Sequence, residues 1–73
     1  MVMEIKEKME IIKLLSDLNG MIIVHKLQGK DTTENFERAK KVAKKLSEEG
    51  IGNFDFSSDE AFEESLNNFL TEF

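Results

Sequence analysis

The chain of 73 residues has no cysteine and no proline, and His25 is its only histidine. The absence of cysteine excludes disulfide bonds, thiolate metal sites and cysteine nucleophiles. A structural zinc site made of histidines alone is excluded as well, because it needs more than one. A domain of this size gains little net stability from a single apolar core. We therefore expect either efficient helix packing or burial against a second chain.

Long apolar runs are lacking too. The longest, residues 21–24, is far shorter than a membrane span, and residues 1–10 have no apolar region of the signal-peptide type. No linker, internal repeat or low-complexity segment marks a boundary, so residues 1–73 are expected to form one small domain. With no cysteine to report the redox state of the compartment, a cytoplasmic location is the default expectation.

Basic residues are missing from the last part of the chain. Residues 1–45 carry ten basic and seven acidic side chains, whereas residues 46–73 carry eight acidic side chains and no basic one; the net charge is −5. Such an asymmetry can mark an interaction surface. It is equally explained by a basic helix that lies beside an acidic helix in the same molecule.

The clearest element is a helix within residues 31–51, "DTTENFERAKKVAKKLSEEGI". Asp31 is suited to cap its N-terminus, with Glu34 three residues later completing a capping box. Gly50 is placed for a left-handed residue after the helix, so that Ile51 folds back on Leu46 in a Schellman motif. The apolar positions recur at helical spacing: Phe36, Ala39, Val42, Ala43 and Leu46.

Two strands are expected on either side of this helix. Residues 21–27, "MIIVHKL", are short, rich in β-branched side chains and bounded by glycines, which is typical of a buried strand. Residues 51–57, "IGNFDFS", alternate so that Phe54 and Phe56 share one face. Together the elements predict a βαβ unit at about 21–56 with a right-handed crossover. The predicted class is α/β (α+β).

The N-terminal third supports two interpretations. Residues 4–18 are rich in helix formers, with Lys6, Glu10, Lys13 and Asp17 on one solvated face, and Asn19-Gly20 would end the helix. Alternatively, Asn-Gly forms the turn of a β-hairpin at about 10–27, giving a three-stranded sheet with two helices. We favour the helix, because the apolar spacing fits a period of 3.6 better than a period of 2. The expected order is therefore α-β-α-β-α.

The last element is a C-terminal helix that separates two kinds of side chain. Ser57 is suited to be its N-cap, with Glu60 at the third position. One face is apolar and the first two turns are acidic, where the helix dipole stabilises carboxylates. The apolar face consists of Phe62, Leu66, Phe69, Leu70 and Phe73; the acidic turns hold Asp59, Glu60, Glu63 and Glu64.

No motif for catalysis or for a metal emerges. His25 lies in an apolar segment with no nucleophile or acid beside it, and a structural role is the simpler interpretation. "LQGKDTT" lacks the first glycine and the hydroxyl residue of a phosphate-binding loop. Residues 53–64 lack the first aspartate and the central glycine of an EF-hand loop. We expect no enzyme activity, no metal and no cofactor.

The remaining hypotheses concern binding. The basic residues of the middle helix are interrupted by acids and accompanied by no aromatic side chain, so direct nucleic-acid binding is not expected. The first hypothesis is a non-enzymatic protein-binding module, a small regulator or inhibitor that acts through the acidic and aromatic surface of the C-terminal helix. The second is a phage-type DNA-mimic inhibitor of the anti-restriction or anti-CRISPR class, whose carboxylates occupy the basic groove of a nucleic-acid-binding protein. The third is a designed or stand-alone fold that associates only with itself, for instance as a homodimer.

The predicted partner-binding residues are Asp55, Asp59, Glu60, Glu63, Glu64, Phe69, Glu72 and Phe73.

Overall fold

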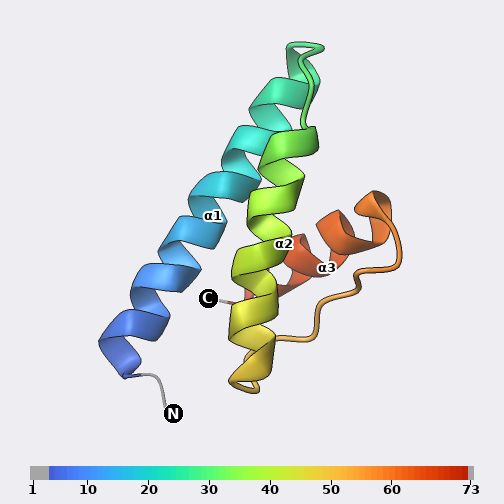
Figure 1. The fold of residues 1–73 in the computed structure, drawn as a ribbon. Helices are drawn as coiled ribbons and strands as arrows, with labels where there is room; N and C mark the ends of the chain where they lie inside the picture. Colours follow the sequence, from blue (N-terminus) through green and yellow to red (C-terminus); the bar gives the residue numbers. More distant parts are fainter. Residues whose placement is uncertain (1–3, 73) are drawn as a thin grey trace.

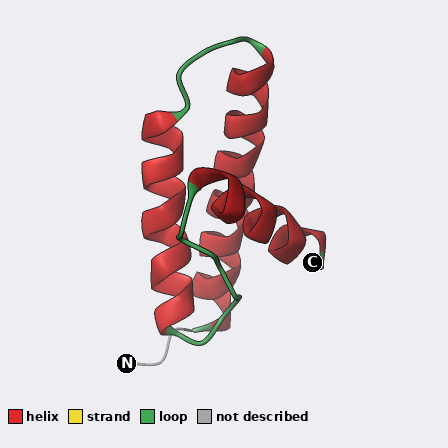
Figure 2. Cartoon of the chain, turned by 90° about the vertical axis from the view of Figure 1, so that its right-hand side faces the viewer, coloured by secondary structure: helices red, strands yellow, loops and turns green. Residues whose placement is uncertain are grey.

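The computed structural model describes residues 4–72, and these residues form three helices and no strand. The helices are α1 (Ile5–Leu27), α2 (Thr33–Glu48) and α3 (Asp59–Thr71). Helices α1 and α2 form an antiparallel hairpin, and α3 crosses this pair on one side, as Figures 1 and 2 show. The molecule is thus all-α, and the prediction of an α/β (α+β) domain is wrong.

The core lies where the three helices meet. Small residues of α2, Ala39 and Ala43, are fully buried and allow α1 and α2 to approach closely. From α3, Phe62 enters the core and meets Phe36 edge to face, with 6.4 Å between the ring centres. The buried apolar side chains are Leu15, Leu18, Ile22, Phe36, Ala39, Ala43, Leu46, Phe62, Leu66 and Phe69.

Helix α1 continues through the segment that was predicted to be a strand. Its buried residues Leu15, Leu18 and Ile22 follow one another at spacings of three and four, so one apolar row runs past Gly20 without a break. Packing of this row outweighs the strand propensity of residues 21–27. Three predictions are therefore wrong: the strand at 21–27, the hairpin alternative at about 10–27 and the helix exit at Asn19-Gly20. The helix predicted over residues 4–18 is present but ends later.

Helix α1 ends instead at a second glycine. Gly29 has a positive φ of 70°. The N–H of Lys30 donates to the carbonyl of His25 (2.8 Å), and the N–H of Gly29 donates to that of Lys26 (3.1 Å). This is the Schellman pattern, which needs a residue that tolerates the left-handed conformation. It reverses the chain within a few residues and so sets α2 alongside α1.

Residues 51–57 form a loop and not a strand, which removes the predicted βαβ unit. Among residues 4–72 there is no strand for this segment to pair with. Its aromatic side chains cover the core: the ring of Phe54 lies 5.0 Å from that of Phe69, and the ring of Phe56 stacks on that of Phe62 at 5.5 Å. The alternation of Phe54 and Phe56, which predicted a strand, has another explanation: both rings pack against side chains of α3.

The capping predictions for α2 and α3 are partly confirmed. At the end of α2, the N–H of Ile51 donates to the carbonyl of Leu46 (3.0 Å) and Gly50 has a φ of 76°, as the Schellman prediction requires. Asp31 is not the N-cap of α2; it precedes the N-cap Thr32, and its carboxylate accepts from the N–H of Thr33 (3.0 Å). The N-cap of α3 is Ser58, one residue later than predicted.

Replacing Ile22 tests the continuity of α1. Ile22 is fully buried, so Ile22→Ala should lower the free energy of unfolding by about 2–5 kcal/mol through lost burial and a cavity. Its neighbour Met21 is 42% exposed, and Met21→Ala should cost less than about 1 kcal/mol. Urea unfolding followed by circular dichroism measures both. Equal losses at the two positions would contradict the helical register.

Replacing Gly52 tests how the loop is held on the core. Gly50 and Gly52 both have positive φ, so alanine at either should cost about 1–2 kcal/mol of strain. A Cβ at Gly52 would also lie 2.6 Å from the ring of Phe54, whereas one at Gly50 meets nothing. Because Phe54 is packed on Phe69, Gly52→Ala should cost about 1 kcal/mol more than Gly50→Ala. Urea unfolding measures both losses of stability. A smaller loss for Gly52→Ala than for Gly50→Ala would refute this account.

Candidate interaction surfaces

Two of the predicted acidic site residues pair with lysines of the other helices. Glu63 of α3 forms an ion pair with Lys26 of α1, and Asp59 pairs with Lys40 of α2 at 2.6 Å. The charge division seen in the sequence is thus partly used inside the molecule, to hold α3 against the hairpin. Such pairs at the surface each contribute little, because water and salt screen them.

The other predicted acids lie at the surface. Glu60, Glu64 and Glu72 are exposed, and no ion pair involves them within the described part of the chain. Glu60 and Glu64 stand one turn apart on α3. Asp55 is exposed in the loop before α3, and its carboxylate accepts a hydrogen bond from the backbone N–H of Ser57 (2.9 Å). These residues leave an acidic surface centred on Glu60 and Glu64.

The predicted aromatic site residues do not join this acidic surface. Phe69 is buried and contacts Phe54, so its ring is part of the core. Phe73 lies outside the described residues. In α3, Glu60 and Glu64 lie on the face opposite Phe62, as the sequence predicted. Asp59 and Glu63 do not share this face, because they turn toward the lysines of α2 and α1. A combined acidic and aromatic surface is not formed by residues 59–72.

His25 is part of the packing between α1 and α2. Its Nδ1 atom lies 2.8 Å from Nδ2 of Asn35, which is itself buried. A buried amide needs such a partner, because leaving it unpaired costs free energy. No group of three or more His, Cys, Asp or Glu residues within 4–72 is placed to hold a metal ion.

Helix α1 carries a second row of residues whose large apolar side chains near both ends face solvent, while Ile12 within the row is partly buried against the core. The row follows positions 5, 9, 12, 16, 20, 23 and 27, which share one side of the helix. Leu27 is 84% exposed, Ile5 76% and Met9 65%. Isolated apolar residues at a surface are ordinary, but several large ones on the same side of one helix are typical of an interaction site. We call this row the α1 stripe: Ile5, Met9, Ile12, Ser16, Gly20, Ile23 and Leu27.

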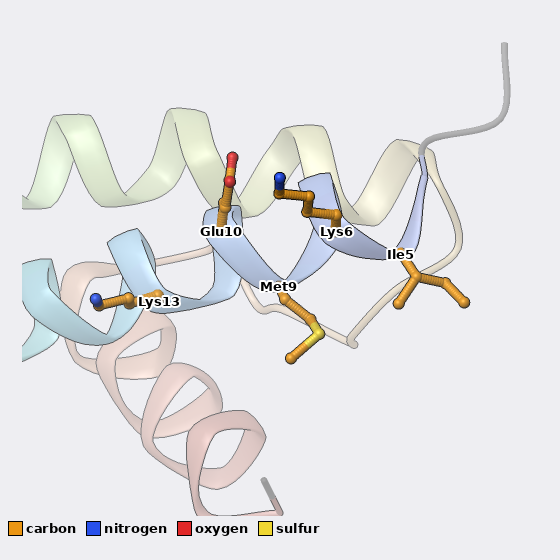
Figure 3. A pocket seen from close by; sticks show the side chains of 5 residues that line it. All are labelled: Ile5, Lys6, Met9, Glu10 and Lys13. Atoms are coloured by element: carbon orange, nitrogen blue, oxygen red, sulfur yellow. The ribbon is translucent and has the colours of Figure 1, made fainter.

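Two shallow hollows lie along the N-terminal half of the α1 stripe. The first, of about 490 Å³, is shown in Figure 3 and is lined by Ile5, Lys6, Met9, Glu10 and Lys13. Ile5 and Met9 point to one side of the helix there, and Lys6 and Glu10 point to another. The second hollow, of about 370 Å³, adds a wall from α3: it is lined by Met9, Ile12, Lys13, Ser16 and Leu70.

The α1 stripe was not predicted from the sequence, although its signal is there. Ile5, Ser16 and Leu27 are eleven residues apart, and the apolar positions between them recur every three or four residues. Ending the helix at residue 18 hides this pattern, because it assigns Ile23 and Leu27 to another element. The solvated face of Lys6, Glu10, Lys13 and Asp17 was predicted, and all four are exposed.

The chain matches no protein-family model, and no similar protein was found among curated proteins or solved structures. None of the helices in residues 4–72 combines the length and the apolar character needed to cross a membrane. The function of the chain is therefore inferred from the surfaces described above.

The pH dependence of stability tests the hydrogen bonding of Asp55. Hydrogen bonds from the side chain and the backbone N–H of Ser57 lower the pKa of Asp55 below its ordinary value of 3.8. The folded state then binds fewer protons than the unfolded state, so this contribution is complete above pH 3.8 and is lost as the pH falls through the lower folded pKa.

Asp55→Asn keeps a side-chain acceptor for the Ser57 N–H but cannot titrate. We expect the difference in unfolding free energy between wild type and Asp55→Asn to shrink as the pH is lowered from 5 toward 2. Urea unfolding at several pH values measures this difference. Ser57→Ala should reduce the same pH dependence, because it removes one of the two donors. If the unfolding free energies of wild type and Asp55→Asn fall equally as the pH is lowered, the hydrogen bonds of Asp55 do not contribute to the pH dependence of stability.

Proposed function

We propose that this chain is a non-enzymatic protein-binding module whose binding surface is the α1 stripe. The observation that supports the proposal is the exposure of large apolar side chains on one side of α1, near both ends of the helix. A helix that is apolar on most sides is normally covered on most sides. Helices α2 and α3 cover the row of Leu15, Leu18 and Ile22 and partly bury Ile12 of the stripe. Four large apolar side chains of the stripe are left for a partner: Ile5, Met9, Ile23 and Leu27.

The shape of the surface favours a helix as the bound element. The two hollows adjoin one another, because Met9 and Lys13 line both, and Leu70 of α3 forms a wall of the second. An amphipathic helix presents side chains at steps of three and four residues. Lys13 borders both hollows, so an acidic residue beside the apolar face of the partner would be favourable.

The acidic surface of α3 carries a second candidate function, the DNA-mimic inhibitor. The observation in its favour is that Glu60 and Glu64 are exposed and one turn apart, a separation of roughly 6 Å that is comparable with neighbouring phosphates. It ranks lower because Asp59 and Glu63 already pair with lysines of the same molecule. Fewer carboxylates then remain for a basic groove.

Site-specific photo-crosslinking distinguishes the two surfaces. A photoreactive amino acid is placed at Met9 in the α1 stripe, at Glu64 on the acidic surface, or at Lys41, an exposed residue of α2 that serves as the control. In cells that produce the chain, irradiation should give a covalent adduct from position 9 and none from position 41. An adduct from position 64 alone would favour the DNA-mimic function. Equal adducts from positions 9 and 41 would refute a binding role for the stripe.

A further inference from the structure

The α1 stripe is symmetric about Ser16. Ile5 and Leu27 lie eleven residues before and after it, Met9 and Ile23 lie seven residues away, and Ile12 and Gly20 lie four away. The row therefore has the same spacing in both directions along the helix. Large apolar side chains stand at both ends, and small residues stand at and near the middle.

A row with this symmetry is complementary to a copy of itself in the opposite direction. We propose that the partner of the α1 stripe is a second copy of this chain, paired through antiparallel α1 helices about a two-fold axis at Ser16; this rests on the proposed function. A two-fold axis sets each residue before Ser16 opposite the residue equally far after it in the other copy. Ile5 then faces Leu27 of the second copy, and the two Ser16 residues face each other.

The hollows match the side chains that this pairing sets opposite them. Met9, which lines both hollows, faces Ile23 of the second copy, and Leu70 gives the second hollow its wall. Leu27 of the second copy lies beside the first hollow. Ile23 and Leu27 are 41% and 84% exposed in the single chain, so the pairing covers part of the apolar surface that α2 and α3 leave open.

The spacing also keeps the two helices in contact along their full length. Positions 5, 16 and 27 repeat every eleven residues, or 3.67 residues per turn, close to the period of a straight helix. Two such helices stay in register with almost no supercoiling. Ser16 and Gly20 have small side chains, and nothing in the molecule lies within 4 Å of a Cβ at Gly20, so the helix axes can approach closely near the two-fold axis.

On one flank of the stripe the charges are complementary in the same register. Lys13 and Asp17 are exposed on one flank of it. Pairing about Ser16 sets Lys13 level with residue 19 of the second copy, two residues along the helix from Asp17 of that copy. Each dimer thus contains two Lys13–Asp17 pairs between copies. Ion pairs at the exposed edge of an interface contribute little to affinity, but they favour one relative orientation of the two helices, here the antiparallel register.

Sedimentation equilibrium of the purified chain gives the first test. We expect a concentration-dependent mass that rises from 8.4 kDa toward twice that value. Ile23→Glu places a charge in the stripe and should weaken dimerisation at least about 100-fold. Met21→Glu is the matched control, because Met21 is 42% exposed on the same helix turn but lies on the opposite side of α1 from Ile23. It should change the dissociation constant less than about threefold.

Single cysteines test the register without disturbing the fold, since the chain has no other cysteine. Under mild oxidation Ser16→Cys should form a disulfide-linked dimer, because the two-fold axis brings these residues together. Ile5→Cys should not, since its counterpart in an antiparallel pair lies at the far end of the helix. Circular dichroism of each variant shows that the helices are retained.

Three outcomes overturn the inference. They are a purified chain that stays monomeric up to millimolar concentration, equal weakening by Ile23→Glu and Met21→Glu, and cross-linking through Ile5→Cys in place of Ser16→Cys. The proposed function fails separately. A monomeric chain that still cross-links through position 9 to a different protein refutes the homodimer and supports the binding role. An absence of adducts from position 9 refutes both.

Discussion

The structure depends on the continuity of α1 across Gly20. Leu15 and Leu18 before this glycine and Ile22 after it form one buried row, and both other helices pack against it. A break at Gly20 would turn Ile22 and His25 away from α2, and the contact between His25 and Asn35 would be lost. Glycine inside a helix costs roughly 1 kcal/mol relative to alanine. Burial of the apolar row on both sides of Gly20 offsets this cost.

The sequence predicts the elements whose signals are local. For α2, the apolar spacing and the Schellman ending at Gly50 and Ile51 agree, and the structure confirms both. For α3, the separation of Phe62 from Glu60 and Glu64 follows from helical periodicity alone. The fold class was missed because residues 21–27 have strand-like composition. The choice there depends on packing against Phe36 and Ala39, which are distant in sequence.

The interaction surface could be predicted only in part, for a related reason. Glu60 and Glu64 were placed correctly at the surface. Asp59 and Glu63 pair with lysines of other helices, and this pairing depends on the tertiary arrangement. The α1 stripe depends on the length of α1, since Ile23 and Leu27 join Ile5 and Met9 on one side only if the helix is unbroken. An error in one helix boundary therefore hid the whole surface.

The turn at Gly29 has a consequence for the order of folding. It joins α1 and α2 through a short reversal, so contacts such as His25 with Asn35 close a loop of only ten residues. Local contacts of this kind form with little loss of chain entropy and favour rapid folding. We expect helix α3 to join later, because its hydrogen bond between Asn19 and Asn67 spans 48 residues. In this order of folding, α3 docks onto an α1 that is already helical.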